Sequence, residues 1–119
     1  MSITIYGIKN CDTMKRARAW LEQRRVDYSF HDYKASGIER ERLEGWCKKV
    51  GWETLLNRNG TTFRQLADKD KTGIDAKKAM ALMLAQPSMI KRPVLDLGGG
   101  KLIVGFTPEL YRDALAARH

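Results

Sequence analysis

The first 33 residues switch between two kinds of hydrophobic pattern, and this switch constrains the fold more than any other feature. Residues 3–6 alternate apolar and polar side chains and include two β-branched isoleucines, which predicts a strand. Residues 12–25 repeat apolar side chains at spacings of three and four, which predicts an amphipathic helix. Residues 26–33 alternate again and predict a second strand. Such a strand–helix–strand unit implies a parallel pair of strands with a right-handed crossover.

The middle of the chain has helical patterns only, so we expect a helical insertion at about residues 36–87. Asp75 suits the N-cap of its last helix, because a carboxylate there accepts a hydrogen bond from the first turn. The expected helices are residues 38–50, 52–56, 63–67 and 76–85.

Strands return towards the C-terminus. Residues 93–97 and 101–104 predict two strands, which a run of three glycines joins as a hairpin. Thr107 and Pro108 suit the N-cap and the first position of a final helix. The buried face of this helix is expected to consist of Leu110, Ala114, Leu115 and Ala117.

The order of the expected elements is β-α-β, helices, β-β-α. This is an α/β fold of the thioredoxin type with a helical insertion between its two halves. A chain of 119 residues is expected to form one domain, residues 1–119. Because the chain has neither a signal-peptide pattern nor an apolar run near the roughly 18 residues of a membrane span, we expect a cytoplasmic protein without a membrane partner.

Cys11 follows the first expected strand, after Gly7 permits a turn, and opens the first helix. A helix N-terminus presents unpaired N–H groups and the positive end of the dipole, which lower the pKa of a thiol. We therefore expect a nucleophile, helped by the N–H groups of Thr13 and Met14. The Thr13 hydroxyl and the cations of Lys9, Lys15 and Arg92 are further candidates. The alternative is a small buried cysteine; Pro93, placed before the third strand where this fold has its second landmark, favours the nucleophile.

Cys11 has no partner cysteine nearby. A redox Cys-x-x-Cys motif would need a cysteine at position 14, where this chain has Met14. Cys47 is expected on the apolar face of a helix, as a core residue. Two cysteines cannot form a four-cysteine zinc site, and we expect no metal site. A net charge of +8 favours anionic ligands, although it also serves solubility alone.

Three separated segments carry a resemblance to a known family. They are Asn10-Cys11-Asp12-Thr13, residues 55–63 (Leu-Leu-Asn-Arg-Asn-Gly-Thr-Thr-Phe) and residues 90–94 (Ile-Lys-Arg-Pro-Val). In these the chain resembles the ArsC-like family, which contains glutaredoxin-linked arsenate reductases, Spx regulators and YffB proteins. It looks most like the YffB branch.

The resemblance implies that Cys11 is the catalytic cysteine. Of the three arginines that hold the oxyanion in arsenate reductases, one transfers to Arg92. The first falls on Asn57, with Arg58 beside it, and the third falls near Val104. The main chain at Pro93 is expected to pair with the peptide of glutathione. The expected substrate or glutathione site is Lys9, Asn10, Asp12, Thr13, Met14, Arg92 and Pro93.

Three functions follow as hypotheses. The first is a monomeric thiol–disulfide reductase with no bound cofactor, in which glutathione is the co-substrate and a protein disulfide or glutaredoxin is a partner. The second is a Spx-like regulator that docks on RNA polymerase, although Met14 removes the redox switch of that branch. The third is a glutaredoxin-coupled arsenate reductase, which lacks two of the family's arginines.

Overall fold

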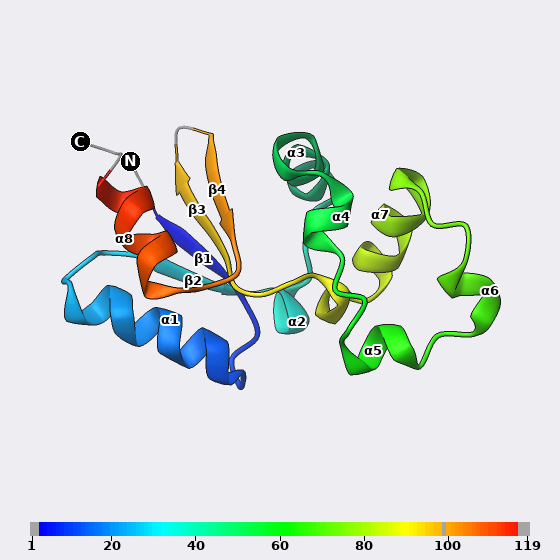
Figure 1. Cartoon of the computed structure of the whole chain (residues 1–119), viewed down its shortest axis with the longest axis horizontal. Coiled ribbons are helices and arrows are strands. Elements are labelled where there is room, and N and C mark those ends of the chain that lie inside the picture. Colours follow the sequence, from blue (N-terminus) through cyan, green and yellow to red (C-terminus); the bar gives the residue numbers. More distant parts are fainter. Residues whose placement is uncertain (1–2, 99, 117–119) are drawn as a thin grey trace. The chain divides into compact units, whose positions relative to one another are not determined.

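The computed structural model describes residues 3–98 and 100–116 of the chain. It divides into two compact units. The first combines the start of the chain, up to Asp32, with its end, from Arg92, and the second is the segment Tyr33–Lys91. The first unit contains a mixed sheet and the second consists of helices linked by loops (Figure 1). The thioredoxin-like α/β fold with a helical insertion is therefore confirmed, while the expectation of one domain stays a prediction.

The sheet of the first unit has the strand order β2–β1–β3–β4. The strand β1 (Thr4–Gly7) pairs in parallel with β2 (Ser29–Asp32), as the crossover pattern requires. It pairs on its other side with β3 (Val94–Gly98), which is antiparallel to both β1 and β4 (Lys101–Val104). The parallel pair and the terminal hairpin were both predicted.

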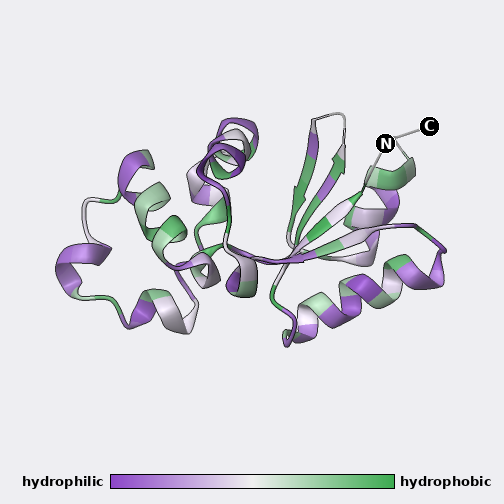
Figure 2. Ribbon diagram, turned by 180° about the vertical axis from the view of Figure 1, so that it is seen from behind, coloured by the Kyte–Doolittle hydropathy of each residue, from purple (hydrophilic) through white to green (hydrophobic). Residues whose placement is uncertain are grey.

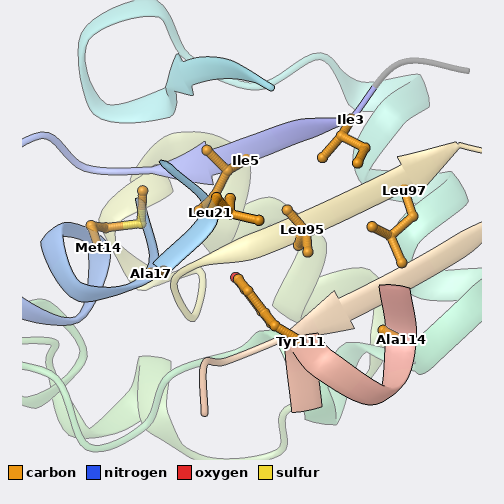
Figure 3. Packing of buried hydrophobic residues seen from close by; sticks show 9 residues of the cluster. All are labelled: Ile3, Ile5, Met14, Ala17, Leu21, Leu95, Leu97, Tyr111 and Ala114. Carbon is orange, nitrogen blue, oxygen red and sulfur yellow. The ribbon is translucent and has the colours of Figure 1, made fainter. Parts of the chain in front are cut away.

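Two helices, α1 (Asp12–Gln23) and α8 (Pro108–Ala116), share one hydrophobic core with the sheet. The apolar residues of α1 recur at spacings of three and four, so they gather on one side of the helix, while much of the rest of α1 is hydrophilic (Figure 2). Ile3, which directly precedes β1, Ile5 of β1 and alternate residues of β3 complete the core (Figure 3). Its members are Ile3, Ile5, Met14, Ala17, Leu21, Leu95, Leu97, Tyr111 and Ala114.

The buried face of α8 differs from the predicted one. Leu110 is 44% exposed, whereas Tyr111 is fully buried. The ring of Tyr111 meets Phe106 edge to face, with the ring centroids 4.8 Å apart, and Trp20 at 5.8 Å. These aromatic contacts orient the helix with Tyr111 inward. The other three expected positions are Ala114, which is buried, Leu115, which is partly buried, and Ala117, which lies outside the described residues.

The second unit has its own buried residues, among them Tyr33, Leu43, Leu55 and Met83. The Tyr33 hydroxyl donates a hydrogen bond to the carbonyl oxygen of Ile90 at 2.8 Å, which joins the two ends of this unit. Its helices are α2 (Tyr33–Ser36), α3 (Arg40–Val50), α4 (Trp52–Leu55), α5 (Thr61–Arg64), α6 (Asp68–Lys71), α7 (Ala76–Ala85) and the 3₁₀ helix η1 (Pro87–Met89).

The start of β2 is later than predicted. The N–H of Val26 donates to the carbonyl of Leu21 at 3.0 Å, and Arg25 has a φ of 56°, so this segment closes the end of α1 before the strand begins. The strand then ends early because Tyr33 already belongs to α2.

Candidate active site

Cys11 is the N-cap residue of α1, with extended backbone angles of φ −126° and ψ 129°. Its carbonyl accepts a helical hydrogen bond from the N–H of Lys15 at 2.9 Å. The thiol is partly buried and packs against the core of the first unit. The sulfur therefore lies at the turn of α1 whose N–H groups have no partner within the helix.

The pKa of the Cys11 thiol is lowered from its ordinary value of 9.0. Partial burial of the sulfur raises this pKa, because burial disfavours the thiolate. The N–H groups of Met14 and Thr13 and the guanidinium of Arg92 act in the opposite direction as hydrogen-bond donors, and Arg92 adds its positive charge. The sulfur does not have the geometry of a regular side-chain cap of the helix. Together the donors outweigh the effect of burial.

The register of the sheet explains how Arg92 comes close to Cys11. Because β1 and β3 are antiparallel, with Tyr6 opposite Val94, the end of β1 lies beside the start of β3. Cys11 follows β1 and Arg92 precedes β3, so the two side chains meet at the same end of the strand pair.

Pro93 follows Arg92 through a cis peptide bond. It is buried, it has no N–H, and its carbonyl already accepts a hydrogen bond from the N–H of Gly105 at 2.9 Å. The hydrogen bond between Gly105 and Pro93 ties the turn that carries Arg92 to the end of β4. The expected pairing of the main chain at Pro93 with the peptide of glutathione stays a prediction.

The loop between β1 and Cys11 is held by a side chain that the sequence analysis did not identify. The N–H of Lys9 donates to Oδ2 of Asp32, at the end of β2, over 3.3 Å. The side chains of Lys9, Asn10 and Asp12 are exposed, so they border the site on its solvent side. The sequence could have indicated this contact, because Asp32 is an acidic residue at the end of the strand that runs parallel to β1.

The structure adds detail to two expectations about the surroundings of the sulfur. The Thr13 hydroxyl accepts a hydrogen bond from Nη2 of Arg16 at 3.5 Å, and the N–H of Thr13 is one of the groups that lower the pKa of Cys11. Of the three cations expected near the thiol, Arg92 is the one that lowers its pKa within the described part of the chain.

Gly7 and Met14 form a contact that the sequence analysis missed. Met14 is 1% exposed, and a Cβ added to Gly7 would lie 2.6 Å from Cε of Met14 and closer still to its Sδ. Gly7 has no positive φ. Glycine here leaves room for the thioether of Met14, rather than providing the positive φ of the turn that we expected.

Cys47 belongs to α3 in the second unit. It is partly buried rather than a full core residue. Burial raises the pKa of its thiol, and the carboxylate of Glu44 adds to this. Its environment therefore has the opposite effect on thiolate formation from that of Cys11.

The resemblance places the first family arginine in the loop at residues 57–59, which has hydrogen bonds of its own. Oδ1 of Asn57 accepts a hydrogen bond from the N–H of Asn59 at 3.1 Å, which shapes the loop. Arg58 is exposed, with its guanidinium carbon 5.4 Å from the ring centroid of Trp52.

These features agree with the family comparison. The profile of the ArsC family matches residues 6–114, a span that includes Cys11 and Arg92. The chain belongs to the ArsC family. The resemblance inferred from the three sequence segments is thereby confirmed.

Solved structures of similar proteins support the family and the fold. The YffB protein is 60% identical with a TM-score of 0.91, and the match covers 96% of this chain and 99% of that chain. An arsenate reductase (ArsC) related protein from Brucella melitensis is 58% identical with a TM-score of 0.77, over 97% of this chain and 95% of that one.

Related sequences include an uncharacterized protein and a transcriptional regulator. An uncharacterized protein of Haemophilus influenzae is 38% identical over 96% of this chain and 99% of its own length. The global transcriptional regulator Spx of Streptococcus pyogenes is 24% identical over 96% of this chain and 85% of its own length. In the described residues of this ArsC-family chain, no helix is both long and apolar enough to cross a bilayer.

Proposed function

We propose that this ArsC-family protein is a glutathione-dependent thiol–disulfide reductase with Cys11 as its nucleophile. The observation that carries the proposal is the lowered pKa of Cys11, produced by the N–H groups of Met14 and Thr13 and by Arg92 against the effect of burial. The thiolate is the reactive form in disulfide exchange, so this environment favours reaction near neutral pH.

The proposed reaction uses one protein thiol and two exchange steps. The Cys11 thiolate attacks a mixed disulfide between a protein and glutathione; the Cys11–glutathione disulfide forms and the protein thiolate leaves. A second glutathione thiolate then attacks the glutathione sulfur of that disulfide. Glutathione disulfide forms, and the electron pair returns to Cys11 as a thiolate. We place this reaction in the cytoplasm, where the glutathione pool is reducing.

Arg92 has a second proposed role, as the partner of a glutathione carboxylate. A guanidinium binds a carboxylate through two parallel hydrogen bonds, and Arg92 already lies beside the sulfur that would carry the glutathione. The exposed residues Lys9 and Asn10 are proposed to line the path of the ligand, with Asp12 at the edge of the first turn.

The two cysteines of the chain provide a matched test. Cys47→Ser leaves Cys11 as the reporter, and Cys11→Ser leaves Cys47, whose thiol pKa is raised. We expect iodoacetamide to alkylate Cys11 with a midpoint below 9.0 and Cys47 with a midpoint above it. Incubation with glutathione disulfide should add one glutathione at Cys11, seen by mass spectrometry. A Cys11 midpoint at 9.0 without an adduct would contradict the proposal.

Substitution of Arg92 tests the charged part of the site. In Arg92→Met the midpoint of Cys11 alkylation should rise by about half a unit to one unit, which is about three- to tenfold less thiolate at neutral pH. Arg92→Lys keeps the charge and should lie between Arg92→Met and the wild type. An unchanged midpoint in Arg92→Met would remove Arg92 from the site.

The same pKa shift makes stability depend on pH. The folded pKa of Cys11 lies below the 9.0 of an ordinary thiol, so the thiolate stabilises the fold fully above 9.0, and this contribution is lost as the pH falls through the lowered value. The difference in unfolding free energy between wild type and Cys11→Ser should therefore grow with pH across that window in urea titrations.

The related Spx regulator supports a second candidate, a binding module. In this case the chain would dock on RNA polymerase and the thiol would be dispensable. Retention of purified RNA polymerase by immobilised wild type and by Cys11→Ser to the same extent would favour the module over the reductase.

A third candidate, arsenate reduction, draws on the ArsC-related protein from Brucella melitensis. By the family resemblance, the first of the family's three arginines falls on Asn57 and the third falls near Val104. A glutaredoxin-coupled arsenate assay decides: turnover abolished by Cys11→Ser would replace the first proposal, and absence of turnover would leave it in place.

A further inference from the structure

The end of β1 and the first turn of α1 meet at one tight contact between Gly7 and Met14. Gly7 is buried, and the position of its missing Cβ is occupied by the thioether of Met14, with Cε 2.6 Å away. Met14 is 1% exposed and belongs to the core with Ile5, Ala17 and Leu21. The Met14 side chain therefore cannot move towards β1, and a larger residue at position 7 would push it away.

The same residue supplies a main-chain donor to the thiol. The N–H of Met14 acts on the sulfur of Cys11, while its side chain packs on Gly7, and one Cα joins the two groups. The carbonyl of Cys11 bonds to the N–H of Lys15, so the cysteine is fixed to this turn as well. Side-chain packing on β1 and a main-chain donor to the sulfur thus belong to the same residue.

We propose that Met14 is a positioning residue: its thioether, packed on the bare Cα of Gly7, holds the first turn of α1 so that the Met14 N–H faces the sulfur of Cys11. This inference rests on the proposed function of Cys11. Met14, which stands where a Cys-x-x-Cys motif would have its second cysteine, would then have a structural role in the site.

If Met14 only packs in the core, its substitution should lower stability and leave the pH midpoint of Cys11 alkylation unchanged. If Met14 positions the first turn, its displacement should change that midpoint as well. The thiol midpoint is therefore the readout, measured by iodoacetamide alkylation in a Cys47→Ser background.

In Gly7→Ala the added methyl group meets the thioether and displaces Met14. We expect the midpoint of Cys11 alkylation to rise by about half a unit, or about threefold less thiolate at neutral pH. Met14→Ala makes room for that methyl group, so adding Gly7→Ala to Met14→Ala should change the midpoint much less. Met14→Leu keeps the volume and should stay near the wild type.

The control is Leu21→Val, which removes a methylene from the same core two turns further along α1. It should lower the urea midpoint of unfolding and leave the alkylation midpoint where it is. If Gly7→Ala does not fold, the test is the comparison of Met14→Ala with Met14→Leu. We expect the alkylation midpoint of Cys11 to rise in Met14→Ala and to stay near the wild type in Met14→Leu.

The outcomes separate this inference from the proposed function. A wild-type midpoint below 9.0 that stays the same in Gly7→Ala and in Met14→Ala overturns the role of Met14 and leaves the reductase proposal standing. A wild-type midpoint at 9.0 overturns both. Equal shifts from Gly7→Ala with and without Met14→Ala overturn the inference too, because the effect would not pass through the thioether.

Discussion

At the residue scale, the thiol of Cys11 depends on two kinds of donor that respond differently to change. The N–H groups of Thr13 and Met14 belong to the main chain of α1 and persist as long as its first turn is formed. Arg92 is a side chain and is removed by one substitution. Comparing side-chain variants with variants that displace the turn therefore separates charge from helix geometry in the control of one thiol.

Another residue-scale feature is the buried hydroxyl of Tyr111. Within the described chain it has no hydrogen-bond partner, it points among apolar side chains (Figure 3), and burial raises the pKa of Tyr111. Because an unpaired buried hydroxyl is unfavourable, Tyr111→Phe should raise the unfolding free energy by about 1 kcal/mol in urea titrations.

Tyr33 is the matched control for this prediction. Its hydroxyl is also buried but donates to the carbonyl of Ile90 at 2.8 Å. Tyr33→Phe should therefore lower the unfolding free energy, by about 1–2 kcal/mol. A loss of stability in both variants would show that the Tyr111 hydroxyl has a partner after all.

At the element scale, the N-caps explain which helix boundaries are sharp. The N–H of Lys78 donates to Oδ1 of Asp75 at 2.8 Å, which defines the start of α7. Asp75→Ala should lower the unfolding free energy by about 1 kcal/mol in urea titrations. Glu39→Ala is the comparison, because Glu39 caps α3 without a side-chain hydrogen bond and should change stability little. Equal effects of the two substitutions would contradict this account.

Elements with a clear hydrophobic period were predictable, and those held by tertiary contacts were not. The bounds of α7 agree with the sequence because its N-cap and its period coincide. In contrast, α6 has no buried residue and therefore no period to detect. Nζ of Lys78 donates to the carbonyls of Lys69 and Thr72, at 2.8 and 2.7 Å, and so braces this segment from α7.

The candidate site also has parts that could be predicted from the local sequence and parts that depend on tertiary contacts. The place of Cys11 at a helix start is a local property, so the sequence was enough to predict it together with its two N–H donors. The proximity of Arg92 depends on the antiparallel register of β1 and β3, and it was expected from the thioredoxin-type order of elements, in which Arg92 precedes the third strand, and again from the family resemblance. Neither the hydrophobic pattern of the sequence nor the family resemblance predicts the contact of Gly7 with Met14.

At the scale of the whole molecule, Cys11 and the groups that lower its pKa all belong to the first unit. A change in the core of the second unit should therefore affect stability without affecting the thiol. We expect Leu43→Ala, at a fully buried position of α3, to lower the unfolding free energy by about 2–5 kcal/mol. The pH midpoint of Cys11 alkylation in the folded variant should equal that of the wild type; a shifted midpoint would mean that the second unit tunes the thiol.

The pairing of β1 with β3 also sets an order of events during synthesis. Cys11 leaves the ribosome before Arg92, which precedes the strand that must pair with β1. A nascent chain thus carries the cysteine before it carries the cation. All the groups that lower the pKa of its thiol are in place only after Arg92 and the strand that follows it have been added.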